Sequence, residues 1–257
     1  MFKRSILPAV VLNVFLLQTG QASQVCPGTG LFDKSALVFD SLVICAKPDV
    51  PAAKLTHAAQ VAAEWLDNDG DGRIDEPRLL DSMKKSKPLL VMSQSEFSER
   101  DIERLEDTLD DRIVQDLYGQ ETNPGGSRRD ASQEEIHHLV INAGWAVLYP
   151  DIFSDQPRSK VYRAWQKADR EGYYSYNDPT CDAACKSTEF FYLATAAYLG
   201  SDADLHSDEM RLKNRKTLKD SLPETVRIIE SDAYSYPKFH WPTGHYSHSS
   251  NIVYSGL

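Results

Sequence analysis

Two short segments of this sequence place oxygen and nitrogen ligands at spacings that suit metal ions. The first, residues 67–76, reads DNDGDGRIDE and carries aspartates at its first, third and fifth positions. Oxygen ligands at alternate positions converge on one cation, and Ca²⁺ takes roughly six to eight such oxygens. Gly72, at the sixth position, permits the sharp turn that this geometry needs. The segment therefore predicts a calcium-binding loop.

The expected calcium ligands are four carboxylates and one backbone carbonyl: Asp67, Asp69, Asp71 and Asp75, and the carbonyl of Arg73. Arg78 stands at the twelfth position, where a sensor EF-hand has a bidentate glutamate, and Pro77 precedes it. The loop therefore resembles the EF-hand-like loops of dockerins and thrombospondin type 3 repeats, which implies a structural calcium. An acidic surface turn without metal is the alternative, although three close aspartates would repel one another there.

The second segment, residues 132–138, reads SQEEIHH and combines carboxylates with imidazoles. Residues four apart share one face of a helix, so Glu134 and His138 lie together, with Glu135 beside them. The pattern resembles the zincin helix H-E-x-x-H with Glu134 in place of the first histidine. This resemblance implies that Glu134 and His138 are metal ligands and that Glu135 is the general base that activates water.

Zincins of the gluzincin type take a further glutamate from a later helix, and Glu189 fits that place. Residues 187–197, STEFFYLATAA, resemble the E-F-F-A-x-x-F stretch of lethal-factor-like peptidases. Glu189 lies among apolar residues, where an unpaired carboxylate would be costly; a metal or Lys186 would satisfy it. Two carboxylates and one imidazole make a harder site than the usual zinc site, so zinc, manganese, iron and calcium all remain candidates.

The residues of the same helix can also be explained without a metal. Ser132 and Glu135 match the capping-box pattern S-x-x-E, and glutamates in a first helical turn complement the helix dipole. This alternative explains Glu134 and Glu135, but it does not explain His138 or Glu189.

The remaining histidines give weaker signals. His240, His245 or His248 could supply a ligand or a transition-state donor, with Tyr236 and Tyr246 near them in sequence, although histidines in a polar tail more often have no specific role. His57 matches no ligand spacing and is expected to be a core or surface histidine.

The elements that must position these groups are mostly helices. Apolar periodicity predicts helices at residues 52–66, 79–85, 96–118, 134–149, 159–170 and 182–199. Strands are predicted at residues 37–46 and 89–92, and the chain after residue 201 is expected to be irregular. We therefore predict the α+β class, as a mainly helical single domain with a small N-terminal sheet, zincin-like at best.

Residues 1–22 have the features of a secretory signal peptide, with Lys3 and Arg4 before an apolar run and small residues, Gly20 and Ala22, before the expected cut. An uncleaved anchor is the alternative, but the run is short for a membrane span. No later segment has 18 consecutive apolar residues. We expect residues 23–257 to form one secreted domain, in the periplasm or the medium, with no membrane span.

Export places the four cysteines in an oxidising compartment. Of the three possible pairings we favour Cys26–Cys45 with Cys181–Cys185, which separates an N-terminal pair from a local one. A metal site is the alternative for the C-x3-C pair, and it is weak because no second such pair is present.

The composition excludes several classes of protein. The chain has 257 residues, 41% hydrophobic and 26% charged, which argues against a disordered, collagen-like or coiled-coil chain. Its net charge is −10, from 28 Lys+Arg against 38 Asp+Glu, and removal of the signal peptide makes it −12. Nucleic-acid binding needs a positive footprint, so no nucleic-acid partner is expected.

The loop, the E-E-x-x-H helix and the stretch T-C-D-x-x-C-x-x-T-E-F-F-Y together resemble a group of secreted proteins that contain an EF-hand-type loop, over residues 55–200. We predict a secreted calcium-binding protein and metal-dependent, metallopeptidase-like hydrolase, with calcium and zinc or another divalent transition metal as cofactors. Its substrate would be a peptide or cell-envelope material. The alternatives are a non-catalytic calcium-stabilised binding or envelope protein and a hydrolase of another class, such as a cell-wall amidase.

Overall fold

The structure is a computed structural model that describes residues 25–106, 109 and 111–257. The predicted signal peptide, residues 1–22, lies outside the described residues. Helices dominate, and five strands form one small mixed sheet, so the predicted α+β class is confirmed. Within the described part of the chain, no helix is both long and apolar enough to cross a bilayer.

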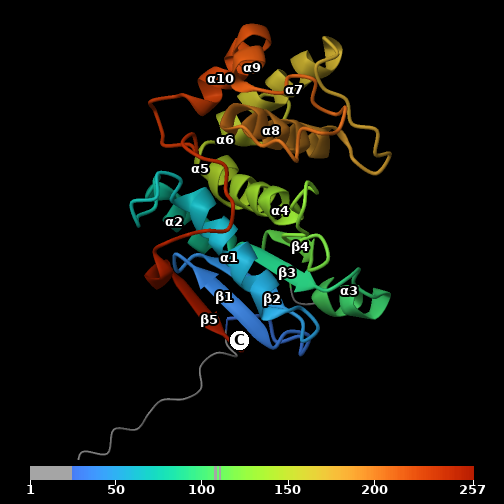
Figure 1. The fold of residues 1–257 in the computed structure, drawn as a ribbon, viewed down its shortest axis with the longest axis vertical. Helices are drawn as coiled ribbons and strands as arrows, with labels where there is room; N and C mark the ends of the chain where they lie inside the picture. The colour runs from blue at the N-terminus through green and yellow to red at the C-terminus, as the bar shows by residue number, and fades with distance from the viewer. Residues whose placement is uncertain (1–24, 107–108, 110) are drawn as a thin grey trace, which may run out of the picture.

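The sheet lies at one end of the molecule (Figure 1). Its strands are β1 (Lys34–Val38), β2 (Leu42–Ala46), β3 (Leu89–Ser93), β4 (Val114–Tyr118) and β5 (Ile252–Ser255). They follow the order β4-β3-β2-β1-β5, in which β1 is antiparallel to β2 and β5, whereas β2, β3 and β4 are parallel. Parallel neighbours need long crossover connections, and helices supply them here.

The first four helices of the described residues are α1 (Ala52–Leu66), α2 (Arg78–Ser86), α3 (Glu99–Glu106) and α4 (Ala131–Val140). A π-helical turn, η2 (Ile141–Trp145), continues α4 into α5 (Ala146–Leu148) and α6 (Pro150–Phe153). The later helices are α7 (Lys160–Arg170), α8 (Ala183–Leu199), α9 (Arg215–Ser221), α10 (Pro223–Ile229) and the 3₁₀ turn η3 (Ser249–Asn251).

The elements stack in layers above the sheet. In β2, Ile44 faces the main core formed with α1 and α4, whereas Cys45 faces a smaller cluster with Leu89 and Leu105 on the opposite face. Helix α1 buries a row of alanines, which lets α4 approach closely. Helix α8 then packs on α4, and α7 packs on α8 and α10 (Figure 1). The strongly apolar α8 therefore lies inside the molecule.

Both predicted disulfides are present. Cys26 is bonded to Cys45 of β2, and Cys181 is bonded to Cys185 at the start of α8. The first ties the segment before β1 to the sheet, and the second closes the turn that leads into the buried helix. The metal alternative for the C-x3-C pair is therefore excluded.

Three predicted elements were wrong. One strand was predicted over residues 37–46, but residues 34–46 form the hairpin of β1 and β2, and Phe39 and Asp40 take positive φ values of 47° and 51° at its turn. Residues 96–118 form the short helix α3 and the strand β4 instead of one helix. Ile113 and Leu117 fitted the predicted helix because residues four apart lie on one face of a helix and also on one face of a strand. The chain after residue 201, predicted to be irregular, contains α9, α10 and β5.

The segment 231–251, here called the C-terminal strap, runs from α10 back to the sheet (Figure 1). The buried carboxylate of Glu64 accepts backbone N–H bonds from Thr243, Gly244 and His245 at 2.7, 2.7 and 3.1 Å. The side chain of Gln133 donates to the carbonyl of Pro242 at 2.6 Å. The strap therefore fixes α1 and α4 against each other.

Candidate metal centre

Helix α4 begins at Asp130, which is its N-cap. The Asp130 carboxylate accepts from the backbone N–H of Ser132 at 3.1 Å and from its hydroxyl at 2.7 Å. Ser132 is therefore inside the helix, and the predicted capping box of Ser132 with Glu135 is wrong. His57 of α1 is buried and lies 2.6 Å from the second Asp130 oxygen, so it has a defined partner, which its spacing did not indicate.

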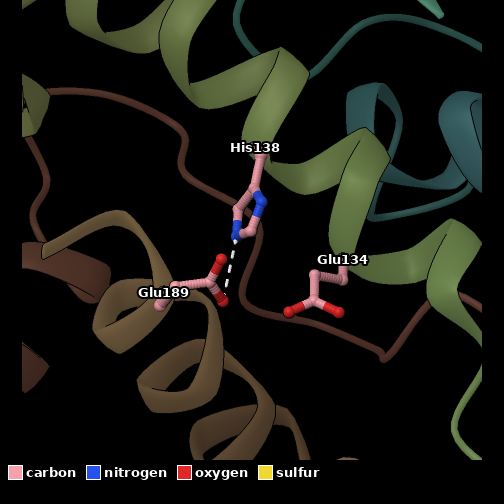
Figure 2. A group of neighbouring side chains, drawn as sticks. All are labelled: Glu134, His138 and Glu189. Carbon is pink, nitrogen blue, oxygen red and sulfur yellow. Dashed lines mark ion pairs between the residues drawn. The ribbon is translucent and has the colours of Figure 1, made fainter. Parts of the chain in front are cut away.

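The structure brings Glu134, His138 and Glu189 together. One ligand atom from each lies within 4.8 Å of the others, and Figure 2 shows the two α4 side chains pointing toward Glu189 of α8. The His138 Nε2 to Glu189 Oε2 distance is 3.7 Å. This is too long for a hydrogen bond but close to the separation of about 3.4 Å expected for two ligands of one tetrahedral metal ion.

The imidazole of His138 has a nitrogen atom that is free to bind a further ligand. Its Nε2 is buried and has no hydrogen-bond partner, which is uncommon for a buried polar atom. Burial and the nearby Arg129 lower the pKa of His138 to about 3. The ring is therefore neutral, which is the form that binds metals.

The carboxylates of the cluster are held at high pKa. Burial and then the charge of Glu134 raise the pKa of Glu189 to about 9, and the same two causes raise the pKa of Glu135 to about 8. Burial likewise raises the pKa of Glu134. The charged forms repel one another in a medium of low polarity, and a divalent cation among them would remove that cost.

Arg129 is a site residue that the sequence did not reveal. It forms an ion pair with Glu134, lies 3.1 Å from Asp204, and stacks 5.4 Å above the ring of Tyr192. Tyr192 in turn donates to Asp204 at 2.6 Å. Arg129 thus neutralises part of the cluster's charge and holds one oxygen of Glu134. Its only sequence signal is its place in the loop that leads into α4.

Glu135 lies beside the cluster. Its Oε2 atom is 3.9 Å from Nδ1 of His138, and it accepts a hydrogen bond from Gln115 of β4. This places Glu135 at the ring edge of His138 that does not face Glu189. A pocket of about 230 Å³ opens next to the cluster, with Gln115, His138 and Glu189 in its wall. A small group could therefore reach the ligands from outside.

In the loop at residues 67–76, ligand atoms of Asp67, Asp69 and Asp71 lie within 4.8 Å of one another. Asp67 is completely buried at the end of α1, whereas the other two are exposed. The backbone N–H groups of Asp71 and Gly72 donate to Asp67 at 3.1 and 2.9 Å. Gly72 has a φ of 89°, so the predicted sharp turn is present.

Asp75 and Arg73, the other two predicted loop ligands, form hydrogen bonds within the loop. Asp75 accepts from the backbone N–H of Asn68 at 2.9 Å, and burial raises its pKa to about 7. Arg73 donates its own N–H to Asp71 at 2.8 Å. Arg78, at the twelfth position, pairs with the buried Glu76 at 2.6 Å. The structure thus gathers three of the four predicted carboxylate ligands in one group, and the carbonyl of Arg73 stays a prediction.

The C-terminal strap contacts the loop. Tyr246 donates to Asp67 at 2.6 Å, and Nε2 of His248 lies 2.9 Å from the carbonyl oxygen of Gly70. His245 instead contacts Thr243. Among the described residues, neither these histidines nor His240 belongs to the Glu134–His138–Glu189 group, so the strap supplies no ligand there.

Comparison of the chain with protein-family models, with curated proteins and with solved structures found no match. The site must therefore be interpreted from its own geometry.

Proposed function

We propose that this protein is a secreted metal-dependent hydrolase that holds a divalent transition metal between Glu134, His138 and Glu189. The observation that carries the proposal is the buried, unpartnered Nε2 of His138 facing two carboxylates. Export is supported by the features of residues 1–22 and by the two disulfides. Residues 23–257 would form the secreted domain.

The donor set fits such an ion. Two carboxylate oxygens and one neutral imidazole nitrogen suit zinc, manganese or iron. The bound cation would supply Lewis acidity to a carbonyl oxygen of the substrate and to the attacking water. Glu135, held by Gln115 at the ring edge of His138, would accept the proton of that water and later return it to the leaving amine. We take the substrate to be a peptide or cell-envelope material.

We further propose that the loop at residues 67–76 holds a structural calcium. Its support is the convergence of Asp67, Asp69 and Asp71, with the backbone already turned as a calcium loop requires. Tyr246 and His248 contact this loop, so an ion there would stiffen both the loop and the strap.

A non-catalytic calcium-stabilised binding or envelope protein is the second candidate. Its specific support is Arg129, which already pairs with Glu134 and is itself balanced by Asp204. In that case Arg129 would take the place of the cation in neutralising the cluster.

Elemental analysis of the purified mature protein after calcium chelation separates the two candidates. We expect about one transition-metal ion per chain, its loss in His138→Ala, and its retention in Glu103→Ala, a control at an exposed position of α3. A metal-free wild type after metal-replete expression would overturn the hydrolase proposal. A metal-loaded protein that cleaves no member of a quenched fluorescent peptide library would favour the non-catalytic candidate.

A further inference from the structure

A second surface of the molecule has a charge opposite to that of the whole chain. It is a groove of about 540 Å³ between α7 and α10, here called the basic groove. Its cations are Lys160, Arg163, Lys167, Arg170 and Arg227. Ala164 and Ile228 form part of its wall and are buried. A protein with a net charge of −10 thus gathers five of its 28 basic residues at one groove.

Most of these cations lack a partner. Lys167 pairs with Glu224 at 2.7 Å, and Glu224 is the one carboxylate in the lining. Lys160, Arg163, Arg170 and Arg227 are exposed, and in the described part of the chain no carboxylate lies within 4.0 Å of their charged groups. Glu224 is thus the one carboxylate in the groove for five cations, although the chain has 38 acidic residues.

The cations also form a line. Lys160, Arg163, Lys167 and Arg170 recur at helical spacing along one side of α7, over about 15 Å at a rise of about 1.5 Å per residue. Arg227 faces them from α10. A ligand that meets all of them must carry negative charges repeated along its length, so a single small anion would leave most of the groove unused.

We propose that the basic groove binds a linear anionic polysaccharide that carries sulfate, phosphate or carboxylate groups. Arginine guanidinium groups contact such oxyanions through two parallel hydrogen bonds, and three of the five cations are arginines. The lining contains no aromatic side chain, which single-stranded nucleic acids would need for base stacking. Its apolar residues are buried instead of protruding, which disfavours insertion into a membrane surface.

The basic groove is separate from the candidate metal centre. Helix α8 packs against both α4 and α7 (Figure 1), and no residue of the groove belongs to the metal-ligand group. Binding at the groove therefore does not depend on the proposed hydrolase activity. It would place the protein on an anionic glycan surface whether or not the centre is active.

The test uses the mature protein and a fluorescent heparin octasaccharide, with affinity measured between 50 and 200 mM salt (roughly the range over which phosphate-type contacts are lost). We expect saturable binding that weakens about 10-fold in the double variant Arg163→Gln and Arg170→Gln, with a salt slope reduced by about 1 for each cation removed. The matched control is Lys85→Gln with Arg100→Gln, two exposed cations outside the groove. It should bind as the wild type does.

Four outcomes would overturn the proposal. They are absence of heparin binding by the wild type, equal weakening in the two double variants, tighter groove-dependent binding to a single-stranded DNA 20-mer, and groove-dependent binding to phosphatidylglycerol vesicles without heparin binding. Circular dichroism melting of each variant shows that the fold is intact. The single variant Arg227→Gln, on the other helix, should weaken heparin binding too and serves if the α7 variant does not fold.

Discussion

The loop at residues 67–76 takes its three converging aspartates from five consecutive positions at the end of α1, whereas the cluster at α4 takes its ligands from two helices, with His138 and Glu189 51 residues apart. In the loop, two of the three carboxylates are exposed, so water can screen their repulsion. In the cluster, burial raises the pKa of Glu134 and raises that of Glu189 to about 9. A bound cation would therefore relieve little repulsion in the loop and much more in the cluster.

The difference also shows which parts of the fold each site requires. The loop geometry is set by local hydrogen bonds and by Gly72. The cluster exists only if α4 and α8 pack correctly, with Asp130 starting α4 and the strap holding Gln133. Changes at the cluster should therefore alter chemistry, and changes at the loop should alter stability.

The largest expected effect is at Glu135. Loss of a general base costs a factor of about 10² to 10⁴ in rate, so Glu135→Gln should lower peptide hydrolysis by that amount while metal content stays unchanged. Rate and elemental analysis are measured on the same preparation. Because Glu135 lies 3.9 Å from Nδ1 of His138, it could instead orient the imidazole. Metal loss together with activity would show that orienting role and contradict the base assignment.

The next effect concerns the loop. If calcium binds, a concentration 100 times its dissociation constant should stabilise the protein by about 2.7 kcal/mol and raise Tm by about 5–10 °C. Asp69→Ala with Asp71→Ala should abolish this shift without changing the transition-metal content. Asp202→Ala with Asp208→Ala, also exposed aspartates, should keep it. A calcium-dependent Tm that survives in the loop variant would refute the loop site.

The smallest effect tests the start of α4. Burial raises the pKa of Asp130, but hydrogen bonds from His57 and the backbone of Asn123 outweigh it, so the folded pKa lies below its usual value. Its charge therefore stabilises the fold above about pH 4, and that contribution is lost as the pH falls further through the folded pKa. Asp130→Asn keeps a good N-cap and removes the charge.

We expect Asp130→Asn to be less stable than the wild type by about 1–2 kcal/mol at pH 7, and the two to converge once the pH falls below the lowered folded pKa of Asp130. Urea unfolding at several pH values measures this difference. A constant difference at all pH values would mean that the amide disturbs packing and that the Asp130 charge has no part in the stability.

Sequence patterns were informative where the chemistry is local. The helix at residues 52–66, the loop turn at Gly72 and both disulfides were predicted correctly. The meeting of Glu134, His138 and Glu189 also agreed with the prediction, because a buried carboxylate in an apolar helix needs a partner. The sequence indicates that Glu189 needs a partner, and the structure shows that Glu134 and His138 lie next to it.

Two of the missed features depend on contacts between residues distant in sequence, and the third is a local helix cap. Arg129 reaches Asp204 only after α8 and the following turn are in place. Gln115 meets Glu135 because residues 114–118 form a strand, which a helical period had hidden. The pattern S-x-x-E suggested that Ser132 caps the helix, but the N-cap is Asp130, two residues earlier. One oxygen atom of Asp130 accepts hydrogen bonds from both the backbone N–H and the hydroxyl of Ser132.

The pairing of β5 with β1 has a consequence for folding kinetics. Ile252 pairs with Val38, and the hydrogen bond from Tyr246 to Asp67 joins residues 179 positions apart. Contacts of such separation slow folding, because a long loop must close before they form. Until β5 arrives, β1 is an unpaired sheet edge that another chain could join. We therefore expect refolding yield to fall steeply with protein concentration, with aggregation starting at β1.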